Sequence, residues 1–306
     1  MRIEKNQYHV AASVLAIATV LAFAPDTWIT MMARAFLLQW TVIFVLLAIL
    51  AAWKRIWPIA ASATSAILLV SAQLPQSPPR VAQRPDEGSL TVMHMNVLQP
   101  NDRHTAVIER ALQSNADIIT FQEVDDTWAN RLKEGLRRHY PHQLIEPRSN
   151  CYGIAMFSRL PFERSRLLEV KGSPFIEATV RHQDRDLRIL SVHATSPGSP
   201  DQFRRRNIQL ATLSEYLREH PGPVVVIGDL NTVPWDDAFK HLISGARLKA
   251  VTADGRLRTW PVVGPLAAIP LDHLLHSHDL ECTSILGSSI PGSDHRGLQA
   301  FISWKE

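Results

Sequence analysis

The sequence predicts an α/β domain that follows an N-terminal transmembrane segment of three helices, and three observations lead to this prediction. Residues 1–78 contain three long uncharged stretches, residues 75–89 are rich in proline, and the remainder carries short apolar runs between helical patterns. Short strands interspersed with helices are typical of α/β domains. We therefore expect a transmembrane region at 1–74, a linker at 75–89 and a folded domain at 90–306.

The predicted transmembrane helices are the uncharged stretches at residues 7–25, 35–53 and 57–74. The second stretch, at about 1.5 Å per residue, matches the thickness of a bilayer core. A cleaved signal peptide is the alternative for the first stretch, because it has a basic start, a short apolar run and Ala-Phe-Ala at 22–24. The two later stretches would anchor the chain in either case.

The basic residues near these stretches predict their orientation. Arg2 and Lys5 precede the first helix, Lys54 and Arg55 lie between the second and third, and Arg34 lies between the first and second. Positive charge favours the cytoplasmic side. We therefore predict a multi-pass protein of a bacterial inner membrane, with its folded domain extracytoplasmic, facing the periplasm or the cell exterior.

The charge of the chain is concentrated near the membrane segment. Residues 1–78 hold five of the 32 basic and two of the 29 acidic groups, which leaves 27 of each for residues 79–306. A neutral folded domain lacks the overall basic surface of a tight nucleic-acid binder, although a local basic patch remains open. Cys151 and Cys282 are too few for a disulfide framework, so we expect free buried thiols, with a pair outside the cytoplasm as the alternative.

Apolar runs and alternation predict the elements of the folded domain. The predicted strands are Leu90–Asn96, Asp117–Val124, Tyr152–Ser158, Ile176–Arg181, Leu187–His193, Val224–Asp229, Leu271–Ser277 and Leu298–Trp304. The predicted helices are Thr105–Gln113, Trp128–His139, Pro200–His220 and Asp236–Ile243. The pattern does not decide between parallel and antiparallel pairing.

Groups that can bind a cation or a phosphate end or flank six of these strands. They are Asn96, Glu123, His193, Asp229, Asn231, Asp272, Asp294 and His295. A strand end is a rigid mount at the edge of a core, and several such ends can converge on one cleft. We therefore expect these side chains to form one site.

The residue types in this set favour hydrolysis at phosphorus. Glu123, Asp229, Asp294 and Asn96 offer hard oxygen ligands suited to Mg²⁺ or Mn²⁺. Histidines beside carboxylates offer acid–base chemistry or a positive charge for a phosphate. The sequence contains no HExxH, no Cys/His zinc spacing, no GxSxG, no P-loop and no dinucleotide fingerprint.

The ordered set N…QE…YG(x)4S…H…GDxN…DH…SDH resembles the endonuclease/exonuclease/phosphatase superfamily, which includes abasic-site endonucleases, deoxyribonucleases and neutral sphingomyelinases. The resemblance covers the chain from about Leu90 to the C-terminus. It implies a four-layer αββα sandwich, with the site at one edge of two packed sheets, and a metal-dependent phosphoesterase activity.

The resemblance implies a role for each catalytic residue. Asp229 would orient or deprotonate the attacking water, and Asn231 would position Asp229 and a phosphate oxygen. His295 would contact the phosphate, and Asp272 would fix the tautomer of His295. His193 would contact the phosphoryl oxygens or assist the leaving group.

The same resemblance implies the metal and substrate contacts. Glu123 would hold the essential cation, Mg²⁺ or Mn²⁺, with Asn96 beside it and Asp294 near it or near a second metal position. Tyr152 and Asn150 would lie near His193 and contact the substrate.

Several residues have two interpretations. Trp260 is placed to stack on a substrate base or sugar, and core packing is the alternative. For Arg204, Arg205 and Arg206 a solvated surface is favoured over a phosphate or anionic-lipid contact. His94 is among the histidines given no site role, and alternation directs His273 away from the site.

Three functions remain in competition. The leading hypothesis is a membrane-anchored phosphodiesterase that acts as a nuclease. The first alternative substrate is a phospholipid head group or a small organic phosphate, and the second alternative is a binding scaffold without activity. One departure bears on the substrate: Pro270 stands two residues before Asp272, where many relatives carry Arg. The sequence leaves the oligomeric state open.

Overall fold

The computed structural model describes residues 2–74, 88–251, 257–264 and 267–305. The chain divides into two compact units, one formed by residues 1–77 together with 234–237 and the other by the remaining residues. Most of the predicted linker, residues 75–87, lies outside the described residues. The two units are described separately below.

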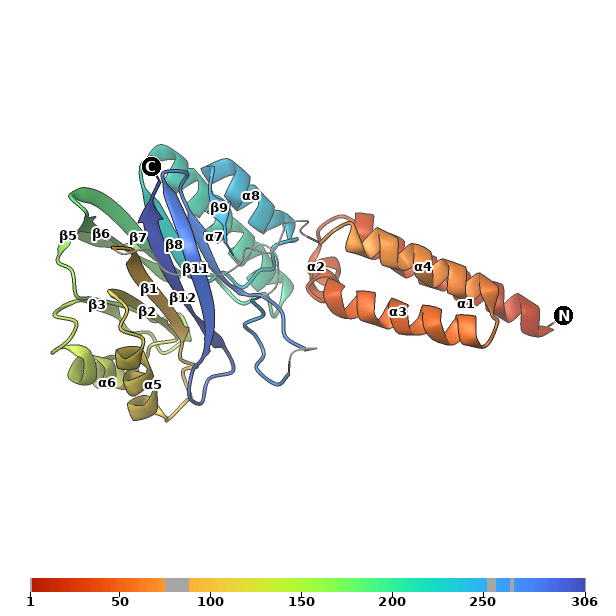
Figure 1. Ribbon diagram of the computed structural model, residues 1–306, viewed down its shortest axis with the longest axis horizontal. Helices are drawn as coiled ribbons and strands as arrows, with labels where there is room; N and C mark the ends of the chain where they lie inside the picture. The colour runs from red at the N-terminus through yellow and green to blue at the C-terminus, as the bar shows by residue number, and fades with distance from the viewer. Residues whose placement is uncertain (1, 75–87, 252–256, 265–266, 306) are drawn as a thin grey trace. The chain divides into compact units, whose positions relative to one another are not determined.

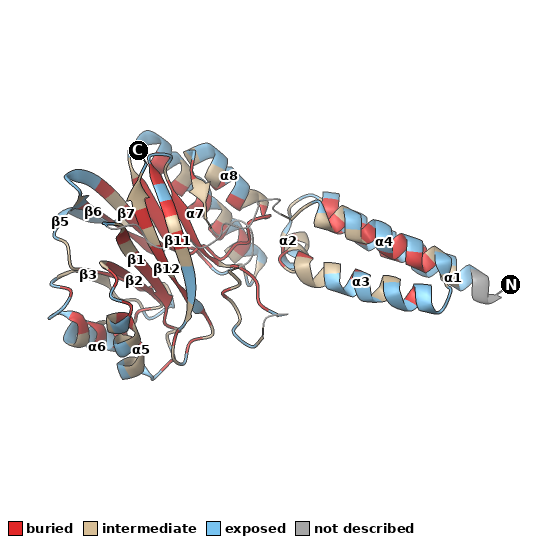
Figure 2. Ribbon diagram, viewed as in Figure 1, coloured by how far each residue is buried: buried red, intermediate tan, exposed pale blue. Residues whose placement is uncertain are grey.

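The N-terminal unit is helical. Its helices are α1 (Arg2–Phe23), α2 (Trp28–Arg34), α3 (Leu37–Trp53) and α4 (Trp57–Ser71). Helix α4 packs against both α1 and α3, and its Ala63, Ala66 and Val70 are fully buried there. Small side chains let helices approach closely. The faces of α1 and α3 that turn away from α4 expose many large apolar side chains (Figure 2).

The prediction of three transmembrane helices is supported only in part. Among the described residues, one helix segment, Lys5–Phe23, is long and apolar enough to cross a membrane. A second candidate is α2 with α3, which are bent by 62° at the break between them. Helix α4 has 15 residues, which at about 1.5 Å per residue is shorter than a bilayer core of about 30 Å.

The second unit contains two mixed sheets (Figure 1). In the described part of the chain, the first sheet has the order β11 (Leu280–Ser289), β12 (Arg296–Trp304), β1 (Leu90–Asn96), β2 (Ile118–Gln122), β4 (Ile154–Ser158) and β3 (His142–Glu146). The second has the order β5 (Phe162–Val170), β6 (Ser173–His182), β7 (Arg185–His193), β8 (Val224–Asp229), β10 (Asp272–His276) and β9 (Lys249–Ala250). The β1–β2 and β7–β8 pairs are parallel.

The helices of this unit cover the outer faces of the sheets. They are α5 (His104–Gln113), α6 (Asp126–Leu136), α7 (Pro200–Glu219) and α8 (Asp237–Ala246). Within the described residues, one apolar cluster fills the space between the sheets. A second joins α5 and α6 to the first sheet, and a third joins α7 and α8 to the second sheet. These clusters separate the layers of an α/β sandwich, as the resemblance implies.

The alternation of β1 directs polar groups into the space between the sheets. Leu90 and Val92 belong to the central cluster, whereas Met93 and Met95 face the helices. Because side chains alternate along a strand, His94 and Asn96 continue the inner face. The end of β1 therefore presents polar side chains at the rim of the core.

In the second unit, helices α6 and α7 begin at capping residues. The Asp125 side chain accepts a hydrogen bond from the Trp128 amide at 2.8 Å, and Ser199 Oγ accepts one from the Gln202 amide at 3.2 Å. Pro200 at the first position of α7 loses no hydrogen bond, because this amide has no partner within a helix. These caps set where α6 and α7 start.

Four strands were not predicted, and all four are the outer strands of their sheets: β3, β5, β9 and β11. Strand β5 is largely exposed and carries charged residues, so it shows no apolar run. The prediction for the cysteines is partly wrong. Cys282 is buried, as expected, but Cys151 is exposed.

Candidate active site

Five of the predicted residues meet where neighbouring strands end. Asn96 ends β1, and His295 stands directly before β12, the neighbour of β1. In the second sheet, the register places His193 beside Asp229 and Asp229 beside Asp272. The sheet edges thus bring together residues that are far apart in the sequence.

The glycine of the GDLN segment is required by the approach of two strands. Gly228 has a φ of 148°, and a Cβ there would collide with the carbonyl of Val192 on β7. Glu123 and Asn231 also have positive φ values, of 64° and 47°. Non-glycine residues in this region carry backbone strain, which is concentrated at functional sites.

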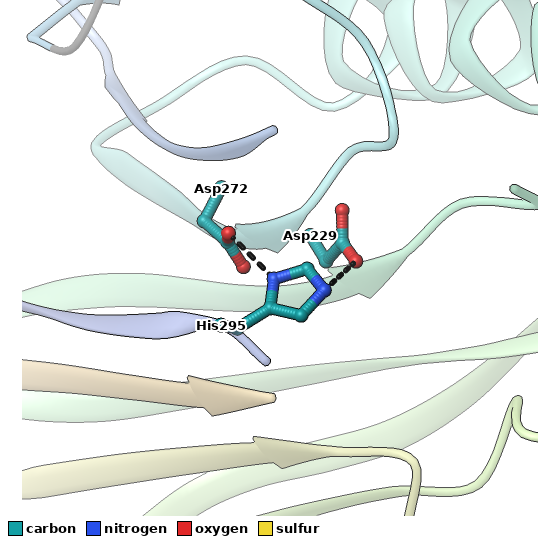
Figure 3. A group of neighbouring side chains, drawn as sticks. All are labelled: Asp229, Asp272 and His295. Carbon is teal, nitrogen blue, oxygen red and sulfur yellow. Dashed lines mark hydrogen bonds and ion pairs between the residues drawn. The ribbon is translucent and has the colours of Figure 1, made fainter. Parts of the chain in front are cut away.

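His295 lies between two carboxylates (Figure 3). Its Nδ1 donates a hydrogen bond to Asp272 Oδ2 at 2.9 Å, and its Nε2 lies 3.8 Å from Asp229 Oδ2. Burial would lower the pKa of the imidazole, but the charge of Asp272, its hydrogen bond and the charge of Asp229 raise this pKa to about 10. His295 is therefore positively charged at neutral pH.

Asp272 is the anion of this pair. Burial alone would raise the pKa of its carboxyl, but the charge of His295 and the hydrogen bonds from His295 and His94 hold the pKa far below its ordinary value. The Asp272 amide also donates to Thr259 Oγ1 at 3.1 Å. The side chain is fully buried, so protein groups replace water around it.

The pKa of Asp229 shifts in the opposite direction, above its ordinary value. Burial and the negative charge of Asp272 raise the pKa of Asp229 to about 8. The Asn231 amide donates to its Oδ1 at 2.9 Å, and Asn96 Nδ2 donates to its Oδ2 at 3.2 Å. A carboxyl with a pKa near neutrality is suited to proton transfer.

The residues around Asn96 fit a divalent cation. Asn96 Nδ2 lies 3.0 Å from Glu123 Oε1, 3.2 Å from Asp229 Oδ2 and 3.5 Å from His295 Nε2. Two carboxylate oxygens therefore accept from one amide nitrogen, and the protonated Nε2 of His295, itself a donor, faces the same nitrogen. Two carboxylates and an amide that can present its oxygen form the hard donor set that Mg²⁺ and Mn²⁺ prefer.

A second group of metal-binding atoms has a simpler explanation. Asp229, Asp272 and His295 bring ligand atoms within 4.8 Å of one another. The two nitrogens of His295 already face the two carboxylates. Hydrogen bonding and charge account for this group without an ion, so we favour Glu123, Asn96 and Asp229 as the cation site.

His193 is buried beside Asp229. Its Nε2 lies 3.8 Å from Asp229 Oδ2, and its ring lies 5.5 Å from that of Tyr152. Burial and the positive charge of His295 lower the pKa of His193 to about 3, so this histidine is neutral at neutral pH. Asn150 is exposed, and its side chain accepts from the Tyr152 amide at 3.3 Å.

Asp294 is held by Trp260. The indole Nε1 donates to Asp294 Oδ2 at 2.7 Å, while Asp294 Oδ1 has no hydrogen-bond partner among the described residues. The Trp260 ring lies 6.4 Å from the His295 ring and is partly exposed. Trp260 therefore borders the site, and the metal role of Asp294 remains a prediction.

Two polar residues at the site, His94 and Arg206, were not predicted from the sequence. His94, given no role, is fully buried with Nε2 2.6 Å from Asp272 Oδ1. Arg206 was expected on a solvated surface, but it is fully buried and donates to the Asn231 carbonyl at 3.2 Å. Successive helical residues point in different directions, so one of three arginines can face inward.

Signals for both residues exist in the sequence. Alternation along LTVMHMN places His94 on the face of Asn96. Arg206 lies on the apolar side of α7 with Phe203 and Leu210. His273 behaves as predicted: its Nε2 contacts the Thr232 carbonyl at 2.8 Å, away from the site.

Known proteins share this architecture. A curated relative, the UPF0294 protein of Vibrio campbellii, is 24% identical over 229 residues, which are 69% of this chain and 77% of the relative. The human Nocturnin catalytic domain with bound sulfate has a TM-score of 0.59 at 21% identity, covering 74% of this chain and 97% of that chain.

Two further structures have the same fold. D. rerio TDP2 complexed with single-strand DNA product has a TM-score of 0.56 at 16% identity, covering 70% of this chain and 99% of that chain. A beta toxin mutant from Staphylococcus aureus with bound magnesium ions has a TM-score of 0.55 at 18% identity, covering 70% and 99%. Likeness at such low identity shows the fold alone.

The family of the chain is shown by its sequence. The pattern described as the Endonuclease/Exonuclease/phosphatase family matches residues 93–295. That range begins on β1 and ends at His295, so it includes every strand end that contributes to the site. The chain belongs to the Endonuclease/Exonuclease/phosphatase family.

Proposed function

We propose that this protein is a membrane-anchored phosphodiesterase that depends on a divalent metal, with nucleic acid as its first candidate substrate. Members of the family are phosphoester hydrolases. The observation that carries the proposal is the convergence of Glu123 Oε1, Asp229 Oδ2 and His295 Nε2 on the Asn96 amide. A cation, an attacking water and a phosphate oxygen need such groups within reach of one another.

The metal role falls to Glu123 and Asn96, with Asp229 beside them. The cation, Mg²⁺ or Mn²⁺, would neutralise the charge that develops on the phosphate. A positive ion would also lower the pKa of Asp229 from its raised value and keep the carboxylate ionised. Asp294 is the candidate for a second, outer contact.

The catalytic roles follow from the charge states. Asp229, fixed by the Asn231 amide, orients the attacking water and accepts its proton. Protonated His295, fixed by Asp272, supplies positive charge to the phosphate. Neutral His193 can donate a hydrogen bond to a phosphoryl or leaving oxygen.

Three partly exposed residues border the site and are the candidate substrate contacts. The Tyr152 ring adjoins His193, Asn150 precedes it on the same loop, and the Trp260 ring adjoins His295. Stacking of a base or sugar on Trp260 would hold a nucleic-acid substrate.

The N-terminal unit supports membrane anchoring. Leu46 and Ile49 of α3 are each 62% exposed, which suits a lipid environment better than water. Lys54 stands beside Trp53 in the turn after α3. Tryptophan is enriched at both membrane interfaces, and lysine and arginine are enriched on the cytoplasmic side. We infer a multi-pass anchor with the catalytic domain extracytoplasmic.

The orientation of the chain can be measured. Fusion of periplasm-active and cytoplasm-active reporters after residue 54 and after Glu306 should give cytoplasmic activity at the first site and periplasmic activity at the second. Cytoplasmic activity at the C-terminus would overturn the extracytoplasmic placement.

A phospholipid head group or a small organic phosphate is the alternative substrate. Val263 is 80% exposed, and it lies on the segment that carries Trp260. Val262 next to it is 42% exposed, and its amide donates to the Asp294 carbonyl. This exposed apolar pair therefore lies next to the site, and on a membrane-anchored chain it would be favoured against lipid over water. The neutral charge of residues 79–306 also argues mildly against long DNA.

One experiment separates these substrates. The purified full chain in detergent or nanodiscs is assayed on bis(p-nitrophenyl) phosphate, plasmid and single-stranded DNA, and phospholipid vesicles, with Mg²⁺, Mn²⁺ or chelator. Asp229→Ala is the inactive variant, and Asp201→Ala, an exposed acid paired with Arg204, is the matched control.

The outcomes distinguish the hypotheses. Metal-dependent cleavage of DNA that Asp229→Ala lacks supports a nuclease, and turnover of vesicle lipid alone supports the lipid alternative. Folded protein that hydrolyses none of these substrates with either metal would contradict the proposed function and favour a binding scaffold.

A further inference from the structure

His94 makes a hydrogen bond that links the two sheets at the site. It lies on β1 of the first sheet, and its Nε2 is 2.6 Å from Oδ1 of Asp272, on β10 of the second sheet. Both side chains have no solvent exposure. In this dry setting the bond is strengthened, and the loss of either partner leaves the other unsatisfied.

The bond completes the surroundings of Asp272. His94 occupies Oδ1, and His295 Nδ1 occupies Oδ2 at 2.9 Å. Because a carboxylate only accepts, the hydrogen of His94 lies on Nε2. Its Nδ1 has no hydrogen-bond partner among the described residues.

Two hydrogen-bond donors fix the plane of the Asp272 carboxylate, which a single donor would leave free to turn. A carboxylate held at one oxygen can turn about its Cβ–Cγ bond, whereas one held at both oxygens keeps its plane. The plane of Asp272 sets the direction of Oδ2 and hence the position of the His295 ring. That ring must keep Nε2 directed at Asp229, 3.8 Å away.

We propose that His94 is a positioning residue that acts through Asp272 to hold the His295 ring toward the reacting phosphate. This role rests on the proposed phosphodiesterase function, but the hydrogen-bond chain His94–Asp272–His295 can be tested without it. The competing explanation is that His94 only ties the sheets together.

Kinetics with two substitutions separate these explanations. His94→Phe keeps a buried ring but removes the donor, whereas His94→Gln keeps a donor of similar reach. We expect His94→Phe to lower kcat about 10–100-fold while KM changes less than about 3-fold, the scale seen when outer partners of active-site groups are lost. His94→Gln should recover most of kcat.

A matched control measures the cost of changing a buried histidine. His276 is also buried, at the other end of β10, where its Nδ1 contacts the Ser277 carbonyl. His276→Phe should lower the melting temperature without changing kcat. If His94→Phe also lowers only the melting temperature, His94 is a structural tie and the proposal is overturned.

A double-mutant cycle tests whether His94 acts through Asp272. His94→Phe in an Asp272→Asn background should reduce kcat by less than about 2-fold, because the group that it positions is already impaired. Multiplied losses would show independent action and overturn the proposal.

Proton resonances provide a measurement that needs no enzymatic activity. In the full chain with nitrogen-labelled histidine, strong bonds to Asp272 should give two low-field imidazole N–H signals. Asp272→Asn should remove both, and His94→Phe should remove one and shift the other. One signal in place of two, or an unshifted His295 signal, contradicts the proposal; intact shifts in a protein without hydrolysis would contradict only the proposed function.

Discussion

The site has two halves that differ in their hydrogen-bond donors. The closed half is Asp272 with His94 and His295, and the open half is Asp229 with Asn96, Asn231 and Glu123. The two aspartates show the difference. Asp272 and Asp229 are register partners on β10 and β8, and both are buried. Asp272 receives hydrogen bonds from two imidazoles, and its pKa falls far below the ordinary value. Asp229 receives hydrogen bonds from amides alone and lies beside the negative Asp272, and its pKa rises to about 8.

The backbone places both carboxylates at the same sheet edge, whereas the neighbouring groups decide whether each carboxylate is charged. Equivalent positions at one sheet edge acquire opposite protonation behaviour because Asp272 accepts a hydrogen bond from His295 at 2.9 Å, whereas Asp229 lies 3.8 Å from the same ring and beside the negative Asp272. The closed half keeps a permanent ion pair. The open half keeps a carboxyl that can exchange protons and attract a cation.

The largest expected effect comes from breaking the closed half. Asp272→Asn removes the acceptor charge of both histidines, so kcat should fall about 10³–10⁴-fold. Stability should fall by about 3–5 kcal/mol, as when one partner of a buried ion pair is lost. Kinetics and thermal unfolding of the full chain measure both.

Asp229→Asn is the matched substitution for this prediction. It should abolish activity while leaving the melting temperature unchanged or higher, because it removes a buried carboxyl whose charge is disfavoured. Equal destabilisation by the two variants would contradict the assigned difference in charge.

A smaller and reversible loss is expected in the open half. Glu123→Gln retains an oxygen donor but loses the charge that attracts a cation. We expect activity to fall about 10–100-fold at low Mg²⁺ and to recover as Mg²⁺ is raised. Titration of activity against Mg²⁺ checks this, with Asp272→Asn as the variant that added metal should not rescue.

Arg206 connects the open half to α7. Arg206→Met keeps an apolar side chain in the buried position but removes the guanidinium, which lies over the Phe203 ring and donates to the Asn231 carbonyl. The Asn231 amide should then hold Asp229 less firmly, and kcat should fall about 10-fold. Arg204→Met, at an exposed position, is the control. Equal kcat values for the two variants would show that Arg206 does not position Asp229.

The smallest effect is a pH dependence of stability. Burial lowers the pKa of His273 to about 4 from an ordinary value of 6.5. Above pH 6.5 the contribution of His273 to stability is fully present. It is lost as the pH falls from 6.5 through 4, because His273 binds a proton in the unfolded chain over this range but stays neutral in the folded chain. The contribution is on the order of 2–3 kcal/mol. Melting temperatures between pH 7 and 4.5 should fall less steeply for His273→Gln, and parallel curves would contradict the assignment.

Central and outer strands differ in how well the sequence predicts them. The central strand β8, VVVIGD, is buried along its length, so its apolar run is visible. The outer strand β5, FERSRLLEV, mixes charged and apolar residues without regular alternation and is mostly exposed, so only pairing with β6 defines it. The central strands, which carry the site, were therefore predicted, and the outer ones were not.

The same contrast applies to site residues. Asp229 and Asn231 lie in a recognisable segment that follows an apolar run, so their place at a sheet edge was predictable. His94 and Arg206 take their roles from Asp272 and the Asn231 carbonyl, which are distant in sequence. A buried polar group needs its partner to be interpreted, and only the packed sheets supply it.

The central claim is that the open half performs metal-dependent phosphodiester hydrolysis. The most direct test is the initial rate of bis(p-nitrophenyl) phosphate hydrolysis by the purified full chain, before and after chelation and after return of Mg²⁺ or Mn²⁺. We expect a rate that disappears with chelator, returns with metal, is absent in Asp229→Ala and is unchanged in Asp201→Ala. A rate that survives chelation, or that Asp229→Ala retains, would contradict the central claim.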